Sequence, residues 1–379
     1  MNLIPSQRAR FDIPREVAYL NTAYMSPLAR EVVAAIDRGA RMKARPWELT
    51  IPDFYDAPDA ARAAFARLVN ADAAGIALVP SASYGIETAA RNLSIGLGKR
   101  VLVLADQFPS HVYPWRRRVR ETGGEILTVT PPPGAEATEA VLAALDERVA
   151  VAALPNVLWT TGARIDLAAV RRRCDEVGAA LVLDLTQSAG AMVTDFAAIR
   201  PDFAVAACYK WLLGPYATGF LHVAPQHWGG APLEEGWIER KDSRNFAGLV
   251  AYTDEYEPGA IRFDMGERAN FALMGGVVAA LELLLGWGVA GIEATLADRN
   301  RRLAARLSGL GLQPMAEAAR GPHFLTARLP EGAPADLLAR LAAKGVHLSI
   351  RAGSLRITPH LWCDEEDEDR FIAALGAAL

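Results

Sequence analysis

Short apolar segments alternate with helix-like segments between residues 75 and 224, and this alternation constrains the fold more than any other feature. Segments with helical periodicity lie between most of the apolar ones, for example YGIETAARNL (84–93) and IDLAAVRRRCDEVG (165–178). Continuous apolar strands alternating with helices are typical of a mostly parallel sheet that is covered on both faces. The seven expected strands are GIALVP (75–80), RVLVLA (100–105), EILTVT (125–130), VAVAALP (149–155), ALVLDL (180–185), DFAVAAC (202–208) and GFLHVA (219–224).

The C-terminal third has a different pattern, which indicates a second, smaller domain. Long helical stretches over 271–308 precede shorter strand-like and helix-like segments, such as SLRITP (354–359). We therefore expect an α/β fold built from two parts. The large α/β domain spans 17–260, the small α+β domain combines 1–16 with 290–379, and helices over 270–290 join them.

One apolar run raises the question of a membrane. Residues 271–292 (FALMGGVVAALELLLGWGVAGI) are long and apolar enough to resemble a membrane span. Glu282 stands in the middle of this run, and Gly286 and Gly288 interrupt it, so two helices packed inside the protein are the better interpretation. The N-terminal MNLIPSQRARFDIP has no apolar segment typical of a signal peptide. We expect no association with a membrane.

Charge and cysteine content argue against a nucleic-acid-binding protein and against a fold held by disulfides. The net charge is −4 with acidic and basic residues mixed along the chain, and no basic block indicates nucleic-acid binding. The three cysteines, Cys174, Cys208 and Cys363, are far apart and form no CxxC pair. A small and odd number of cysteines is typical of proteins in a reducing compartment. We therefore expect a cytoplasmic protein without disulfides and without a metal site.

Polar and aromatic side chains follow five of the expected strands, at the edge where an open α/β sheet binds ligands. Lys210 is the most unusual, because it stands between the apolar segments DFAVAAC and WLLG, and lysine is rarely buried without a partner. A lysine there can be a point charge for a phosphate or a nucleophilic amine, whose pKa falls when apolar neighbours desolvate it. The other candidates are Ser81 and Ser83 in SASYG, Phe108 in DQFPSH, Asn156 in NVLWTTG, and Asp184 and Gln187 in DLTQSAG.

Pyridoxal phosphate (PLP) requires such a combination of groups. It forms a Schiff base with a lysine, and a carboxylate facing its pyridine nitrogen keeps the ring protonated, a role that suits Asp184. Gln187 and Asn156 can bond the phenolic oxygen of the ring. Ser81 and Ser83 open a helix whose free N–H groups suit a phosphate.

Each of these residues also has a purely structural interpretation. Asp184, Ser81 and Ser83 are suited to helix caps or turns, Asn156 follows a proline as turn formers do, and Phe108 alone is typical of a core. The joint pattern favours the cofactor, with Phe108 offering a face for stacking on the ring. The alternating pattern would also suit a nicotinamide dehydrogenase, but the chain has no GxGxxG motif.

These motifs resemble the class V aminotransferase family of PLP enzymes, which includes cysteine desulfurases, selenocysteine lyases, kynureninase and isopenicillin N epimerase. The resemblance runs from YLNTAYMSPLAREV (19–32) to LRITPHLWCDEEDEDRFIAAL (355–375). It implies PLP fold type I, with PLP as cofactor. It also implies a homodimer with shared active sites, because RFDMGERAN (262–270) resembles the segment that reaches the phosphate of the neighbouring subunit.

The resemblance assigns a role to each candidate residue. Lys210 resembles the Schiff-base lysine and Asp184 the partner of the pyridine nitrogen, and Arg356 matches the arginine that binds the substrate carboxylate. Tyr24, Trp159 and His360 are further candidates for substrate binding. The cofactor-binding set it implies is Ser81, Ala82, Ser83, Phe108, Asn156, Asp184, Gln187, Tyr209, Lys210, Gly266 and Glu267.

Some residues depart from the desulfurase pattern. Tyr209 stands where desulfurases usually have histidine and looks more like kynureninase. The short SIRAGSLRIT leaves no room for the loop that carries the desulfurase cysteine, and Cys363 follows Arg356 instead of preceding it. A persulfide-forming cysteine is therefore disfavoured.

The expected function is that of a PLP-dependent enzyme acting on a small amino acid or amine through a Lys210 aldimine. Transaminase, epimerase and lyase chemistry stay open, because the residues around the cofactor do not separate them. A kynureninase-like or cysteine/selenocysteine lyase activity is the alternative. A non-catalytic PLP-binding protein ranks third, because all the residues that the cofactor needs are present.

Overall fold

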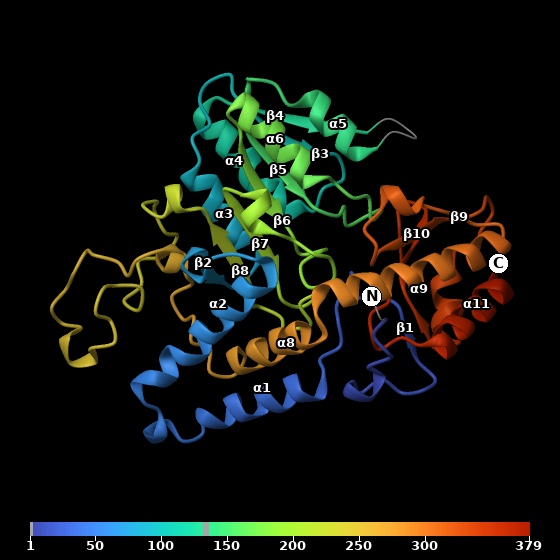
Figure 1. Ribbon diagram of the computed structural model, residues 1–379, viewed down its shortest axis with the longest axis horizontal. Helices are drawn as coiled ribbons and strands as arrows, with labels where there is room; N and C mark the ends of the chain where they lie inside the picture. Colours follow the sequence, from blue (N-terminus) through green and yellow to red (C-terminus); the bar gives the residue numbers. More distant parts are fainter. Residues whose placement is uncertain (1–2, 132–135) are drawn as a thin grey trace.

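The structure is a computed structural model that describes residues 3–131 and 136–379, and a seven-stranded sheet forms its centre (Figure 1). The strand order is β2-β8-β7-β6-β5-β3-β4, and only β8 runs antiparallel to its neighbours β2 and β7. The seven expected strands and the mostly parallel sheet are confirmed. The strands are β2 (Ile76–Val79), β3 (Arg100–Leu104), β4 (Glu125–Val129), β5 (Val149–Pro155), β6 (Ala180–Asp184), β7 (Phe203–Ala207) and β8 (Gly219–Val223).

Helices cover both faces of this sheet, which explains why its strands are apolar throughout. On one face, α3 (Ala82–Asn92) and α4 (Tyr113–Thr122) pack against valines of the central strands. The opposite face is covered by α2 (Asp56–Val69), α5 (Ala137–Ala144), α6 (Leu167–Val177) and α8 (Met274–Trp287), and the short α7 (Phe196–Ile199) packs there too. Because β2, β3, β5, β6 and β7 share one direction, their carboxyl ends meet at one edge of the sheet.

The C-terminal part forms a separate four-stranded antiparallel sheet with helices beside it (Figure 1). The N-terminal segment belongs to this part, because Gln7 N donates to Leu361 O and β1 (Ala18–Tyr19) pairs with β11 (Val346–His347). The sheet order is β12-β13-β10-β9. The other elements of this part are β9 (Gln313–Pro314), β10 (Leu325–Arg328), β12 (Ser349–Arg351), β13 (Ser354–Ile357), α9 (Val289–Gly309), α10 (Leu337–Ala342) and α11 (Glu365–Ala378).

The apolar run at 271–292 forms α8 and the start of α9, which meet at an angle of 73°. The break falls at Gly288, whose φ of +77° suits glycine. Figure 1 shows α8 beside α1 (Arg30–Met42), and α2 packs against α8 as well. Among the described residues, no single helix is long and apolar enough to cross a membrane, although the bent pair α8–α9 meets that test jointly.

Three fully buried histidines lead us to expect a fold that is sensitive to acid. His111, His323 and His360 are fully buried, and burial lowers the pKa of the first two from 6.5 to about 4 and that of His360 to about 3. Since the unfolded chain binds protons at these sites below pH 6.5 and the folded chain does not, acidification favours unfolding. The buried carboxyl of Glu239, whose pKa is raised to about 7 mainly by burial, acts in the opposite direction.

We therefore expect the free energy of unfolding to fall between pH 6.5 and pH 5, by up to about 1.4 kcal/mol per pH unit for each histidine. This window lies above the usual pKa range of exposed carboxylates, so their protonation contributes little. Urea unfolding at four pH values between 7.5 and 5 measures the effect, with His360→Phe as a variant that should show a shallower dependence. Unchanged or rising stability on acidification would contradict the assignment of neutral buried histidines.

Candidate active site

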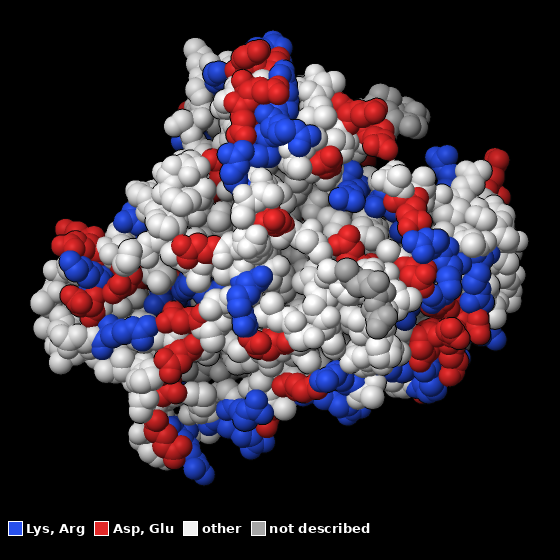
Figure 2. Space-filling view, in the orientation of Figure 1, with Lys and Arg blue, Asp and Glu red and all other residues white. Residues whose placement is uncertain are grey.

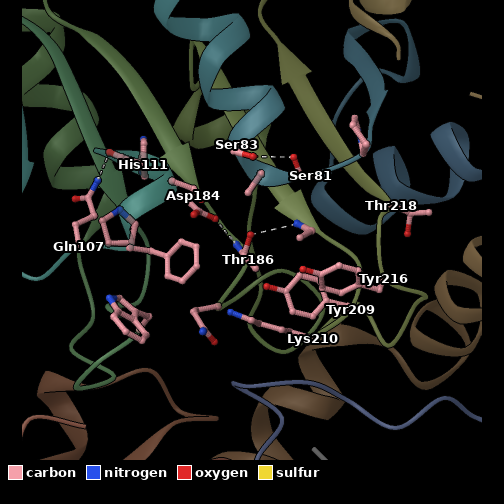
Figure 3. Close-up of a pocket in the computed structure, with 18 of the residues that line it drawn as sticks. Ser81, Ser83, Gln107, His111, Asp184, Thr186, Tyr209, Lys210, Tyr216 and Thr218 are labelled. Carbon is pink, nitrogen blue, oxygen red and sulfur yellow. Dashed lines mark hydrogen bonds between the residues drawn. The ribbon is translucent and has the colours of Figure 1, made fainter. Parts of the chain in front are cut away.

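A cavity of about 250 Å³ lies at the carboxyl ends of the sheet strands (Figure 3). It is lined by segments that follow β2, β3, β5, β6 and β7, as expected for an open α/β sheet. Most of the predicted cofactor residues meet here, together with one predicted substrate residue. They are Ser81, Ala82, Ser83, Phe108, Asp184, Gln187, Tyr209, Lys210 and Trp159.

Lys210 is the buried amine of this cavity, with only 6% of the residue exposed. Its Nζ lies 5.4 Å from the ring centroid of Phe108 and 5.3 Å from that of Tyr209, so aromatic faces replace water around it. Burial lowers the pKa of Lys210 to about 8, although the charge of Asp184 opposes this shift. A sizeable fraction of the amine is therefore neutral near neutral pH, which is the form that attacks a carbonyl carbon.

Asp184 supplies a buried carboxylate at the end of β6, in the same cavity as Lys210 (Figure 3). Its Oδ1 accepts a hydrogen bond of 2.9 Å from the backbone N–H of Thr186. The hydroxyl of Thr186 in turn accepts from Ala207 N at 3.2 Å, which ties this turn to β7. A carboxylate oxygen has more lone pairs than this one bond uses, so Asp184 can accept a further donor from the cavity.

The N-terminus of α3 forms the anion-binding wall of the cavity. The hydroxyl of Ser81 caps the helix by accepting from Tyr84 N at 3.2 Å, and it lies 2.9 Å from the hydroxyl of Ser83. The first turn contains no acidic residue, and its free N–H groups and the helix dipole favour an anion. Ser81, Ala82 and Ser83 therefore fit a phosphate.

Gln187 and Asn156 are placed differently. The side chain of Gln187 borders the cavity, but its Oε1 accepts from Trp211 Nε1 at 2.9 Å and its Nε2 donates to Ala23 O at 3.0 Å. One amide N–H of Gln187 is left for a ligand. Asn156 is buried beside the cavity and does not line it.

Arg356 is a buried guanidinium without an acidic partner in the described ranges 3–131 and 136–379. Only 1% of the residue is exposed, and its Nη1 donates to Trp159 O at 2.8 Å. Its Cζ lies 5.9 Å from the ring centroid of Trp159, which lines the cavity. Burial, followed by the nearby charge of Arg351, lowers the pKa of Arg356 to about 10. A buried guanidinium of this kind is suited to bidentate binding of a carboxylate.

Six predicted residues do not line the cavity: Asn156 and Arg356, described above, and four others. His360 is buried among aromatic rings, with its ring centroid 5.1 Å from that of Trp362 and 6.0 Å from that of Trp211, so we leave it out of the substrate site. Tyr24 is 57% exposed. Gly266 N donates to Glu234 Oε2 at 2.7 Å and Glu267 is exposed, so neither reaches the cavity of its own chain.

The structure also adds residues that sequence reasoning missed. His111 is fully buried in the wall of the cavity, and Tyr216 stands at its mouth with its ring 4.7 Å from that of Tyr209. Gln107 and Thr218 line the cavity as well. His111 could have been found from its place in DQFPSH, the segment after the second expected strand.

Comparisons with known proteins identify the family. The sequence model of the family described as Aminotransferase class-V matches residues 19–361. The chain therefore belongs to the class V aminotransferase family, and like the other members it is a PLP-dependent enzyme. The resemblance seen in the sequence is confirmed. The cavity fits the cofactor, since it brings a desolvated amine, a carboxylate and a helix N-terminus together.

Two curated relatives and two solved structures match almost the whole chain. The kynureninase of Deinococcus radiodurans is 29% identical over 98% of this chain and 92% of its own. The isopenicillin N epimerase of Streptomyces clavuligerus is 25% identical over 98% and 97%. A mutant of the lyase C-DES, with glycine linked covalently to its PLP cofactor, superposes with a TM-score of 0.85 at 19% identity, covering 98% of this chain and 99% of its own. A cysteine desulfurase from Thermococcus onnurineus NA1 has a TM-score of 0.84 at 17% identity, covering 100% and 99%.

Proposed function

We propose that this enzyme binds PLP covalently at Lys210 and acts on the α-carbon of a small amino acid. The observation that supports this proposal most strongly is the buried amine of Lys210, which has a pKa of about 8 and shares one cavity with the carboxylate of Asp184. When bound, PLP supplies an electron sink for the electrons released at the substrate α-carbon. Ser81, Ala82 and Ser83 would hold its phosphate at the N-terminus of α3.

The side chains of the protein would each have a separate role in the reaction. Nζ of Lys210 takes the proton from the substrate α-carbon and returns it, because a neutral amine with a pKa near the working pH is an effective general base. The carboxylate of Asp184 would pair with the pyridine nitrogen of the bound cofactor and stabilise the positive charge there. Arg356 binds the substrate carboxylate and so orients the α-carbon. Phe108 and Trp159, whose rings meet edge to face at 5.5 Å, exclude water from one side.

Burial of the cysteines bears on the type of reaction. Cys174, Cys208 and Cys363 are all buried free thiols, and burial raises their pKa to about 11, 12 and 12. A nucleophilic thiolate in an accessible place is what sulfur abstraction requires. We therefore favour transamination, epimerisation or carbon–carbon bond cleavage over a desulfurase reaction. Buried thiols without disulfides also suit the cytoplasm, the compartment that we propose.

Kynureninase-like cleavage is the second candidate. Tyr209 precedes the lysine, as the resemblance implies for kynureninase, and its hydroxyl-bearing ring packs against Tyr216 at the cavity mouth. The curated relative from Deinococcus radiodurans carries the same name. An aromatic substrate side chain could stack on Trp159 and Tyr216, both of which line the cavity.

A panel of substrates tests the proposed function. The purified enzyme loaded with PLP is mixed with single amino acids and with kynurenine, and the absorbance of the bound cofactor and the products are recorded. A carboxylate-bearing substrate should change the spectrum and form a keto acid, the opposite enantiomer or a cleaved product. The control variant Arg356→Gln should raise KM for that substrate by roughly 10²-fold, since it loses a charged hydrogen-bonded pair. No spectral response to any amino acid would contradict the proposal.

We also propose that the working unit is a homodimer with shared active sites. Gly266 and Glu267 lie outside the cavity of their own chain, which suits a role at the partner's phosphate. Two exposed residues nearby in the sequence, Val250 and Tyr252 at 83% and 96%, would gain cover in a dimer. The apolar run at 271–292 gives less support to a dimer interface than its sequence suggests, because α1 and α2 already cover α8 within the same chain.

Figure 2 shows acidic and basic side chains interspersed over the face in view, in keeping with the mixed charges along the sequence.

Complementation between two inactive variants tests the shared site. Lys210→Ala and Gly266→Asp proteins are dissociated, mixed in equal amounts and reassociated. Each mixed dimer contains one site with both residues intact, so about a quarter of the wild-type activity should return after random pairing. Native mass spectrometry checks that mixed dimers form and that each variant is folded. If mixed dimers form without any recovery, each chain builds its own site.

A further inference from the structure

His111 is a buried polar side chain in the active-site wall for which the proposed chemistry gives no role. It ends the short helix Pro109–His111, is fully buried and lines the cavity. Neither ring nitrogen has a hydrogen-bond partner among the residues that the structure describes. A buried polar group left without a partner costs about 1–3 kcal/mol, so such a group generally has a ligand or a function.

The backbone of His111 is held firmly in place. Gln107 Nε2 donates to the carbonyl oxygen of His111 at 3.1 Å and to Ala153 O at 3.0 Å, while its Oε1 accepts from Leu104 N at 3.1 Å. His111 N donates to Phe108 O at 2.9 Å. A buried, fully bonded amide therefore fixes the turn that presents the histidine ring to the cavity.

Asp184 is the acceptor that the cavity offers to this ring. Among the described residues that line the cavity it is the one carboxylate, and Figure 3 shows His111 and Asp184 on the same side of the cavity. The negative charge of Asp184 acts on His111, raising its pKa against the lowering by burial. Asp184 uses one lone pair for Thr186 N and has others to spare.

We propose that His111 is a positioning residue: its neutral ring, unpartnered in the structure, turns to donate a hydrogen bond to Asp184 and fixes the carboxylate toward the pyridine nitrogen. The proposal rests on the role of Asp184 given under the proposed function. A carboxylate with one fixed bond can still rotate about its side chain, and a second donor removes that freedom. A neutral donor also leaves the negative charge of Asp184 intact for the cofactor.

Nuclear magnetic resonance tests the contact without the cofactor. In cofactor-free protein labelled with ¹⁵N at its histidines, the ring signals of His111 are identified by their loss in His111→Asn. At pH 7.5 we expect one tautomer, with its N–H shifted by the carboxylate, and a changed shift and tautomer balance in Asp184→Asn. Identical His111 signals in wild type and Asp184→Asn would overturn the proposal. This measurement does not involve PLP. Its outcome therefore does not depend on whether Asp184 pairs with the cofactor.

Three substitutions then measure the effect on the loaded enzyme. His111→Leu removes the donor, whereas His111→Asn and His111→Gln each keep an N–H near the position of one ring nitrogen. We expect His111→Leu to lower kcat roughly 10–100-fold with little change in KM, as for other residues that orient a catalytic ligand. One of the two amide variants should recover most of that loss, and circular dichroism confirms folding of all three. Equal losses in all three folded variants, or none in His111→Leu, would also overturn the proposal.

Discussion

Replacing Lys210 by alanine should abolish turnover, with a loss of roughly 10⁴-fold or more, because one amine serves as covalent anchor and as proton carrier. The bound cofactor should also lose the absorbance of its covalently attached form. No other lysine can substitute, since Lys210 is the one buried lysine in the part of the chain that the structure describes. Steady-state rates and the absorbance spectrum of protein loaded with PLP measure both effects.

Lys241→Ala provides the matched control for this substitution. Lys241 is an exposed lysine paired with Glu255, and it does not line the cavity. It should retain the wild-type rate and spectrum. If Lys210→Ala keeps more than a small fraction of the activity while folded, the assignment of the catalytic amine is wrong.

Replacing Asp184 by asparagine should leave PLP bound but reduce kcat by roughly 10²-fold or more, the usual scale when a preorganised charge is removed from an active site. The two side chains are nearly the same size, and the oxygen of asparagine can still accept from Thr186 N. What is lost is the negative charge opposite the pyridine nitrogen. Asp184→Glu keeps the charge but lengthens the side chain, so it separates the effect of the charge on kcat from the effect of its position.

Cofactor affinity and kcat should be measured on the same preparations of these variants. We expect Asp184→Asn to lose far more in kcat than in retained cofactor. Full activity in a folded, PLP-loaded Asp184→Asn enzyme would remove the carboxylate from the mechanism. It would also remove the basis for the proposed role of His111, although the hydrogen bond itself could still be present.

The strands and the residues directly after them were predictable because both depend on local sequence. An apolar run bounded by turn residues indicates a buried strand, and the carboxyl ends of parallel strands meet at one edge. Lys210, Asp184 and Ser81 each stand within three positions of a strand end, and the structure brings them to one cavity. Their spatial relation follows from strand order and needs no long-range detail.

Residues placed by packing between distant segments were harder to predict. His360 has the chemistry of a site residue, but Trp211 and Trp362 enclose it in a tertiary aromatic cluster that the sequence does not reveal. His111 was missed for the complementary reason, because its burial and its nearness to Asp184 depend on how the turn at Gln107 folds back against β5. Similarly, the sequence of 271–292 does not reveal that α1 and α2 cover it.

Borohydride reduction followed by peptide mapping tests the central claim most directly. The purified enzyme with its cofactor is reduced, digested and analysed by mass spectrometry, so that the lysine carrying the cofactor is identified. The chain has five lysines, and four of them are exposed, which makes Lys210 easy to distinguish. We predict that the reduced cofactor is found on Lys210 alone, in near-stoichiometric amount. A label on Lys43, Lys99, Lys241 or Lys344, or no label on a PLP-loaded and active enzyme, would contradict the assignment of this cavity as the active site.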